Sequence, residues 1–473
     1  MSQFISVFDM LKVGVGPSSS HTLGPWRAAQ QWIQTLIEAN FFPEVSRIQI
    51  DLYGSLSLTG KGHATDLAIQ LGLSGEDPET IDVDQIDAII QDIASFQKLK
   101  FNGLKEIEFS QEDLIFNREF LPYHANGMRL TAFRDEELLS EEVYYSIGGG
   151  FVVQENQQLE KESLKKKNFP FPIEKAKQLE DYCHTTGKAI SEIVWQNELE
   201  LRSEEEINRD LRKVWDTMLE CMFIGCHTEG KLPGGLNVKR RAFDTHKKLI
   251  KDSVYKNQSE WIKAIRSTEV KFREILKWVS CFALSVNEVN ASLGRVVTAP
   301  TNGSAGVIPA VLMYYLVIEN HKADFEHIKT FLLTAGEIGS IFKKNATISA
   351  AMGGCQAEIG VSSAMAAAAL TELLGGTASQ VLVAAEIAME HHLGLTCDPI
   401  GGLVQVPCIE RNSMGAIKAI HAAELALETN PEDSLVPLDS VIDTMWETAK
   451  DMNKNYKETS EEGLAVTVGL ADC

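Results

Sequence analysis

Hydrophobic and polar positions follow two different periods along this chain. Residues 47–53 alternate polar and apolar side chains, as a half-buried strand does. Residues 144–153 predict a strand that a tight glycine turn interrupts, and the segment from Leu23 to about Asn40 predicts a helix after a serine-rich start. The first part of the chain therefore mixes strands and helices.

Beyond about residue 170 the apolar period becomes helical. One face is built from side chains at three- and four-residue spacings: Ile207, Leu211, Val214, Trp215, Met218, Leu219 and Met222. Residues 260–290 and 325–343 repeat this pattern, and residues 345–392 are rich in Ala, Gly and Ser, which lets helices approach closely. We expect an α+β protein with a mixed N-terminal domain (1–153), a charged linker (154–169) and a mostly α-helical domain (170–473).

Composition narrows the possible partners. The net charge of -22 over 473 residues argues against nucleic acid and anionic membranes as partners. The N-terminal residues lack the basic and apolar regions of a signal peptide, so we expect a cytoplasmic protein. The longest uncharged stretch, 296–318, is broken by the turn-like residues 300–303 and by Pro309. Its continuous apolar part has the length of a core helix and is too short to span a membrane.

Four of the eight cysteines form a candidate metal site: Cys355, Cys397, Cys408 and the terminal Cys473. The three internal ones stand among Gly, Pro or small residues, where a backbone can bend around a bulky cluster. Their spacing is neither that of a ferredoxin nor that of a zinc Cys-x-x-Cys pair. Cys221 and Cys226 are a competing pair, but they follow an apolar helical face and are interpreted as core thiols, as are Cys183 and Cys281.

Two short motifs supply candidate bases. Residues 14–25 place Ser18, Ser19, Ser20 and Thr22 around His21 at a helix start, an arrangement that suits an anion or a general base. His63 stands between glycines in residues 59–66, just before a helical segment. Without a catalytic role, residues 14–25 would form an ordinary helix cap and residues 59–66 a surface loop. Lys61 as a pyridoxal phosphate lysine is disfavoured, because nothing else resembles such a site.

Three glycine-containing turns are weaker signals. Residues 146–150 include Ser146 and Gly148, and residues 300–306 include Thr301, Asn302 and Gly303 ahead of an apolar helix whose amides can hold a carboxylate. Residues 231–241 end in Lys239, Arg240 and Arg241. This turn is either a loop that attracts an anionic substrate or a solvated basic loop.

Together these motifs resemble the iron–sulfur L-serine dehydratases. The likeness rests on residues 18–22, 60–63, 146–150, 233–241, 299–303, 354–356 and above all 395–412, and it runs from the first residues to the end. It implies the single-chain bacterial form, a [4Fe–4S] cluster without pyridoxal phosphate, and conversion of L-serine to pyruvate and ammonia in amino-acid degradation and gluconeogenesis. It also implies a homodimer and an N-terminal domain able to bind regulatory serine.

The resemblance assigns roles to these residues. Cys355, Cys397 and Cys408 match the internal cluster ligands, Cys473 matches a terminal fourth ligand, and His21 and His63 match the proton-transfer histidines. An iron without a protein ligand can act as a Lewis acid on the serine hydroxyl and carboxylate, while a neutral imidazole removes the α-proton. We favour His63 as this base, although the sequence leaves the two histidines interchangeable. Cys473 must leave the iron before serine binds, which predicts a tail-capped resting state.

Other functions stay open at this point. The same cluster suits an L-cysteine desulfidase, in which a thiol is the leaving group. An aconitase-like hydratase of a hydroxy acid lacks support from a polyanion-binding signature. A serine or iron sensor would not need the paired histidine motifs.

Overall fold

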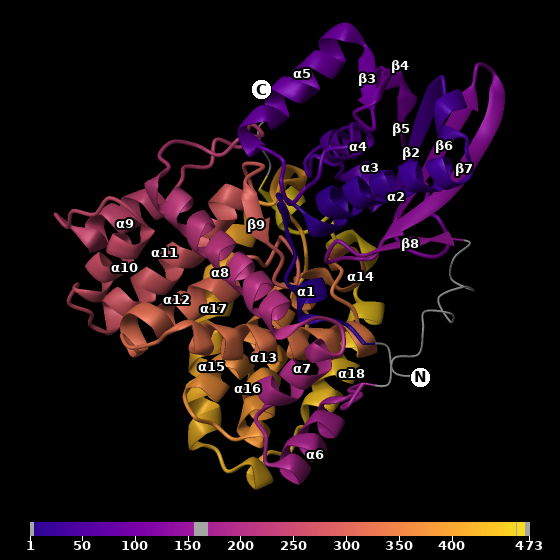
Figure 1. The fold of residues 1–473 in the computed structure, drawn as a ribbon. Helices are drawn as coiled ribbons and strands as arrows, with labels where there is room; N and C mark the ends of the chain where they lie inside the picture. The colour runs from indigo at the N-terminus through magenta and orange to yellow at the C-terminus, as the bar shows by residue number, and fades with distance from the viewer. Residues whose placement is uncertain (1–3, 156–168, 460, 469–473) are drawn as a thin grey trace.

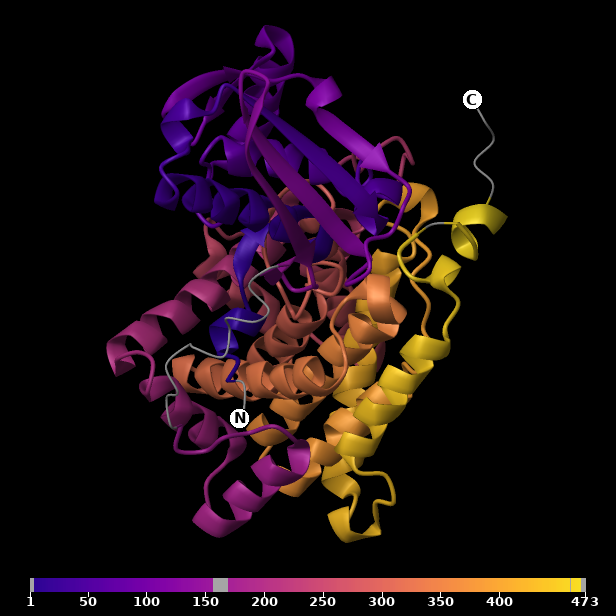
Figure 2. The same cartoon turned by 90° about the vertical axis from the view of Figure 1, so that its right-hand side faces the viewer.

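The computed structural model describes residues 4–155, 169–459 and 461–468, and it has the α+β architecture that the sequence predicts. A domain with a mixed sheet precedes a mostly helical body (Figure 1). The sheet domain sits on one end of that body, and the C-terminal segment lies along its side (Figure 2).

The main sheet has the strand order β5-β2-β6-β7-β8. Its strands are β2 (Arg47–Gly54), β5 (Leu114–Asn117), β6 (Asn126–Arg134), β7 (Glu137–Ser146) and β8 (Val152–Gln154). The alternating segment 47–53 is β2, which pairs antiparallel with β6 and parallel with β5, so the predicted strand is confirmed. A separate hairpin joins β3 (Lys98–Phe101) to β4 (Lys105–Glu108).

Three main helices belong to this domain: α2 (Gly24–Glu38), α4 (Thr65–Leu73) and α5 (Ile86–Phe96). The helix predicted from Leu23 to about Asn40 is α2, and its apolar face shares a core with β2. Trp32 and Ile33 on the helix pack with Ile48 and Ile50 on the strand. The short helices α3 (Ser55–Leu58) and η1 (Ser19–Leu23) also belong to this domain.

The glycine turn expected within residues 144–153 separates β7 from β8. Gly148, Gly149 and Gly150 all have positive φ, a conformation that side chains rarely adopt. At Gly148 an added Cβ would also lie 3.1 Å from the carbonyl oxygen of Ile348. The turn therefore presses the sheet domain against the helical body.

The helical body is assembled around α15 (Ile359–Leu373). Its other long helices are α8 (Glu204–His227), α11 (Phe272–Asn290), α12 (Val307–Tyr314), α13 (Phe325–Asn345), α16 (Ala378–Glu390), α17 (Cys408–Glu428) and α18 (Leu438–Asp451). The peripheral ones are α6 (Ala176–Thr186), α7 (Ile190–Leu199), α9 (Ala242–Ile250) and α10 (Gln258–Arg266), and α14 (Ala350–Gly353) is a single turn. The alanines of α15 are buried and let α12, α13, α16 and α17 pack around it.

The apolar face predicted from Ile207 to Met222 is the buried face of α8. Close packing continues at Gly225, where an added Cβ would lie 2.2 Å from the carbonyl oxygen of Ser285 on α11. Among the described residues, no helix combines the length and hydropathy needed to cross a membrane. The uncharged stretch 296–318 forms part of β9 (Arg295–Val297), a turn, and α12 with the turn that follows it.

The N-terminal residues pack within the helical body. Helix α1 (Val7–Met10) lies among its helices in Figure 1, and β1 (Val13–Val15) pairs antiparallel with β9. Ile5, Val7 and Met10 belong to the large core of the helical body. The chain therefore begins in the helical body before it enters the sheet domain. Of the expected linker, residues 156–168 lie outside the described residues.

Candidate active site

Three of the expected cysteines are buried in the helical body. Cys355 lies in the short helix η8 (Gly354–Ala357), Cys397 in the loop after α16, and Cys408 is the first residue of α17. The Sγ atoms of Cys355 and Cys397 and a carboxylate oxygen of Glu358 lie within 4.8 Å of one another. Burial raises the pKa of Cys408 and the charge of Cys355 adds to this effect, which places Cys408 near the same group.

Arg411 on the first turn of α17 ties these loops together. Its guanidinium donates to Cys355 Sγ at 3.3 Å, to the Thr396 carbonyl at 2.6 Å and to Asp398 Oδ1 at 2.9 Å. The pKa of Cys355 is lowered, first because the Cys397 thiol donates to it and then because Arg411 is close. A cation beside the thiols offsets part of the charge they carry when deprotonated.

The two candidate histidines lie side by side. His21 is in η1 and His63 is in the turn before α4, and their ring centroids are 4.5 Å apart. Burial lowers the pKa of His21 well below 6.5, and a positive charge on His63 would lower it further. Burial also lowers the pKa of His63, to about 4. Both imidazoles are therefore neutral at neutral pH.

Their hydrogen bonds differ. His63 Nδ1 lies 3.0 Å from the Thr59 carbonyl oxygen, so this nitrogen carries the proton and Nε2 keeps its lone pair. His21 Nε2 faces the Ser55 carbonyl at 3.1 Å and the Thr59 hydroxyl at 3.0 Å, while its Nδ1 lies 3.0 Å from Ser20 Oγ. Both nitrogens of His21 are thus engaged within the chain.

A residue that the sequence did not reveal joins the histidines to the cysteines. Glu458 is buried, with Oε1 3.6 Å from His21 Nδ1 and 3.9 Å from His63 Nε2. Its backbone N–H donates to the Cys397 carbonyl oxygen at 2.9 Å. Burial raises the pKa of Glu458, and the charges of Glu358 and Cys355 raise it further. Residues 453–459 are mostly polar and carry no motif that singles it out.

Glu358 is the second missed carboxylate. Burial raises its pKa to about 7, although the Thr301 hydroxyl and Arg411 act in the opposite direction. Its position three residues after Cys355 on the same turn is the only sequence signal for it. An added Cβ on Gly303 would lie 2.8 Å from Glu358 Oε2, so the turn at Thr301–Gly303 faces this carboxylate directly.

The serine-rich segment is buried and largely bonded to itself. Ser18 Oγ accepts from the His21 N–H at 3.2 Å, and Ser20 Oγ lies 3.2 Å from Ser18 Oγ. Ser19 Oγ accepts from the Gly149 N–H at 3.2 Å, beside Gly148 in the glycine turn. Thr22 Oγ1 donates to the His63 carbonyl at 2.8 Å. Ser18, Ser20 and Thr22 therefore hold the histidines, and Ser19 joins this segment to the glycine turn.

Two of the expected binding residues keep unused hydrogen-bonding capacity. Ser146 Oγ and Asn302 Oδ1 are buried and have no hydrogen-bond partner among the described residues. Asn302 Nδ2 donates to the Val15 carbonyl, and Thr301 Oγ1 lies 3.0 Å from Ser304 Oγ. Buried polar atoms without partners are uncommon, so both atoms are candidates for contact with a ligand.

The remaining candidates lie elsewhere or outside the described residues. Cys473 is not among them. Cys183, Cys221, Cys226 and Cys281 are buried in the helical core, with Cys226 and Cys281 Sγ atoms 3.8 Å apart, as the core-thiol interpretation predicts. In the basic loop, Lys239 pairs with Asp244 and Arg241 with Glu410, while Arg240 donates to the Glu288 carbonyl. These cations are held by the chain's own acceptors, so the loop gives no support for an anion site.

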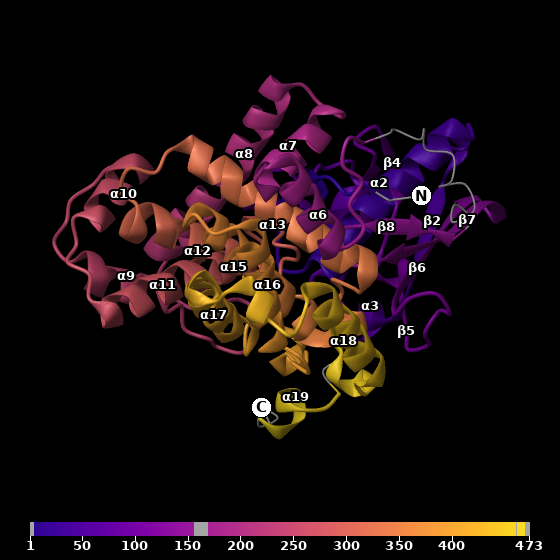
Figure 3. The same ribbon diagram turned by 90° about the horizontal axis from the view of Figure 1, so that it is seen from below.

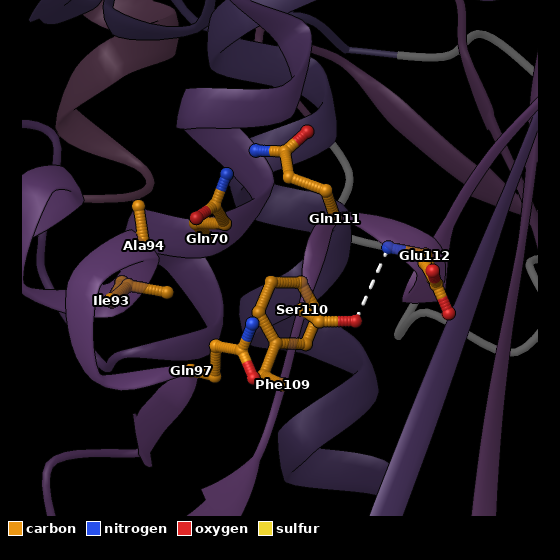
Figure 4. Close-up of a pocket in the computed structure, with 8 residues that line it drawn as sticks. All are labelled: Gln70, Ile93, Ala94, Gln97, Phe109, Ser110, Gln111 and Glu112. Atoms are coloured by element: carbon orange, nitrogen blue, oxygen red, sulfur yellow. Dashed lines mark hydrogen bonds between the residues drawn. The ribbon is translucent and has the colours of Figure 1, made fainter.

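A surface pocket of about 400 Å³ lies in the sheet domain (Figure 4). It is lined by Gln70, Ile93, Ala94, Gln97, Phe109, Ser110, Gln111 and Glu112. The Ser110 hydroxyl accepts from the Glu112 N–H within the loop itself. Its lining contains no histidine or cysteine, so it lacks the chemistry of the buried site.

The donor set of the buried site fits an iron–sulfur cluster. Clusters of this kind are held by Cys thiolates, and here Cys355, Cys397 and Cys408 are buried close together with Arg411 beside them. At Cys408 the helix start and Arg411 act against the effect of burial and favour a thiolate. The cysteines and both histidines thus surround one buried region where the two parts of the chain meet.

Comparison with known proteins gives a consistent result. A family model described as the serine dehydratase beta chain matches residues 6–157, and one described as the serine dehydratase alpha chain matches residues 185–465. The chain is similar to L-serine dehydratase 1 of Escherichia coli K12, 47% identical over 98% of this chain and 99% of that protein. L-serine dehydratases of Haemophilus influenzae and Streptomyces coelicolor are 48% and 46% identical, each over 98% of this chain and 99% of the relative.

Proposed function

The chain belongs to the serine dehydratase family and is a lyase, and we therefore propose that it converts L-serine to pyruvate and ammonia without pyridoxal phosphate. The observation that carries this proposal is the meeting of a neutral histidine pair and a cysteine group across Glu458. Removal of an α-proton and expulsion of a hydroxyl require these two kinds of chemistry together.

Cys355, Cys397 and Cys408 are the residues that would hold a [4Fe–4S] cluster, with Cys473 as a fourth ligand from the tail. When bound, such a cluster supplies a Lewis-acidic iron for the hydroxyl and carboxylate of the substrate. Arg411 holds the loops of Cys355 and Cys397 together, because it donates hydrogen bonds to the Cys355 thiol and to the Thr396 carbonyl. The side chains of His21, His63, Cys355 and Cys397 are buried, which limits the access of water to the region.

The hydrogen bonds favour His63 as the base. Its Nδ1 proton is used by the Thr59 carbonyl, so the lone pair on Nε2 is available to accept the α-proton. His21 keeps both nitrogens in hydrogen bonds and holds the Ser55 carbonyl and the Thr59 hydroxyl beside His63. This interpretation separates two histidines that the sequence alone leaves interchangeable.

The remaining steps follow from substrate chemistry. Loss of the α-proton to His63 and of the hydroxyl as hydroxide leaves an aminoacrylate, and transfer of that proton to the hydroxide gives water. The aminoacrylate then tautomerises and hydrolyses to pyruvate and ammonia. We propose Ser146 and Asn302 as direct substrate contacts, because each has an unpartnered buried oxygen. Thr301 and Gly303 lie beside Glu358, and Ser18, Ser20 and Thr22 support the histidines. Ser19 binds the glycine turn next to Gly148.

The test combines metal content with product formation. Replacing Cys355, Cys397 or Cys408 by Ser is expected to remove iron and pyruvate formation together, whereas Cys221→Ala, in the helical core, retains both. Iron retained in all three Ser variants would contradict the ligand set. Sulfide release from L-cysteine that exceeds pyruvate formation from L-serine would identify the chain as a desulfidase instead. The homodimer, the cytoplasmic location, the regulatory serine site and the domain bounds at 153 and 170 stay predictions.

A further inference from the structure

Glu458 adopts a backbone conformation that glutamate rarely occupies. Its φ is 59°, in the left-handed region, and the residue is only 3% exposed. Residues other than glycine are disfavoured in this region, and such strain is maintained at functional sites when the surroundings enforce it.

Two backbone bonds enforce the conformation. The Glu458 N–H donates to the Cys397 carbonyl at 2.9 Å, and the Glu458 carbonyl accepts from Ser55 Oγ at 2.9 Å. One bond leads to the cysteine loop and the other to the histidine domain. The side chain is thereby fixed between the two halves of the site.

The carboxylate itself is incompletely satisfied. Oε1 lies 3.6 Å from His21 Nδ1 and 3.9 Å from His63 Nε2, and the Ser20 hydroxyl and the Ala351 N–H are close enough to lower the pKa of the carboxyl. Oε2 has no hydrogen-bond partner of ordinary length and angle among the described residues. Leaving a buried carboxylate oxygen without a donor is costly. A donor from a ligand would remove that cost.

Other carboxylates nearby are already engaged. Asp398 accepts from Arg411 at 2.9 Å and from the Leu464 N–H at 2.9 Å. Glu358 faces the Thr301 hydroxyl and belongs to the group with Cys355 and Cys397. Among the described residues of this region, Glu458 is the buried glutamate with a carboxylate oxygen that accepts no hydrogen bond, and it lies beside the histidine assigned as the base.

We propose that Glu458 binds the α-ammonium group of the amino-acid substrate and thereby selects L-serine over hydroxy acids. This inference rests on the proposed function. An ammonium nitrogen bonded to a carboxylate at about 2.8 Å places Cα, about 1.5 Å further on, beside that carboxylate. Because His63 Nε2 lies 3.9 Å from Oε1, the same placement brings the α-proton within reach of the base.

The test compares L-serine with 3-hydroxypropionate, which has the same carboxylate and hydroxyl but no amino group. In Glu458→Gln the KM for L-serine is expected to rise about tenfold to a hundredfold, the range for loss of a charged hydrogen bond. The inhibition constant of 3-hydroxypropionate is expected to change less than twofold. Glu462→Gln, the same substitution at an exposed position of the same tail, leaves both values unchanged.

Direct binding supplies a second readout. In a His63→Ala background, which slows turnover about a hundred- to ten-thousand-fold, calorimetric titration gives the affinity for each compound with and without Glu458→Gln, at equal iron content. Selective weakening of L-serine supports the proposal. Equal weakening of both compounds, or a fall in kcat with unchanged KM, would overturn it, because Glu458 would then act on the site as a whole or through the histidines. A wild-type chain that holds iron yet makes no pyruvate from L-serine would instead overturn the proposed function itself.

Discussion

The rings of His21 and His63 lie 4.5 Å apart at an interplanar angle of 34°, yet only His63 keeps a nitrogen free of hydrogen bonds within its own domain. Thr22 joins the two residues, since it belongs to the turn of His21 and donates to the carbonyl of His63. The two histidines therefore form one unit. Hydrogen bonds hold the ring of His21, and one ring nitrogen of His63 is available to accept a proton.

Replacing His63 by Ala is expected to lower kcat by about a hundred- to ten-thousand-fold, the usual contribution of a positioned base. His21→Ala is expected to abolish turnover as well, because it removes the ring that holds Ser55 and Thr59 in place. Both variants should retain iron. His391→Ala, at an exposed position after α16, is the control, and full activity in both site variants would contradict these roles.

The pH profile provides a separate prediction. Burial lowers the pKa of His63 to about 4, and an imidazole acts as a base only when it is unprotonated. Activity should therefore be lost as pH falls through that lowered pKa, so the acid limb of kcat/KM should lie well below the ordinary 6.5. Enzyme incubated at each pH and assayed at pH 7.5 controls for irreversible loss. An acid limb at or above 6.5 would argue against a buried His63 as the base.

Contact between the histidine loop and the cysteine loop can be tested at Gly62. An added Cβ would lie 2.5 Å from the Gly402 carbonyl oxygen, closer than packed atoms allow. Gly62→Ala should separate the two loops, lower the stability by about 1–3 kcal/mol in urea unfolding and reduce kcat/KM for L-serine. The neighbouring Lys61→Ala, at an exposed position, should leave both unchanged. Loss of activity in Lys61→Ala would instead revive a pyridoxal phosphate lysine.

The terminal cysteine gives a prediction about oxygen. The tail before it is anchored where the Leu464 N–H donates to Asp398, the residue after Cys397 (Figure 3 shows α19, Leu464–Thr467, at the edge of the molecule). Cys473→Ala should shorten the lifetime of the cluster in air and remove any lag in pyruvate formation. Cys183→Ala, in the helical core, is the matched control. An unchanged lifetime in Cys473→Ala would argue against ligation by this residue.

Local patterns predicted the elements whose burial repeats with a fixed period. The alternation in 47–53 predicted β2, and the spacing from Ile207 to Met222 predicted the buried face of α8. These predictions succeeded because each depends only on which side of one element meets the core. The glycines at 148–150 were also predictable, since a tight turn needs positive φ.

Contacts between distant parts of the chain had no such signal. The pairing of Val13 with Val297 places the first strand in the helical body, although nothing in the sequence around Val13 indicates it. Glu458 is the clearest case in the site, because its role arises from contacts with Cys397, Ser55 and the two histidines. Such residues are found only once the chain is folded in three dimensions.

The central claim is that a cysteine-bound cluster and a histidine base together dehydrate L-serine. The most direct measurement is anaerobic purification of the chain, quantification of iron and sulfide, and assay of pyruvate from L-serine before and after exposure to air. We expect about four irons per chain and loss of pyruvate formation in step with loss of the cluster. Pyruvate formation by protein that holds no iron would contradict the account.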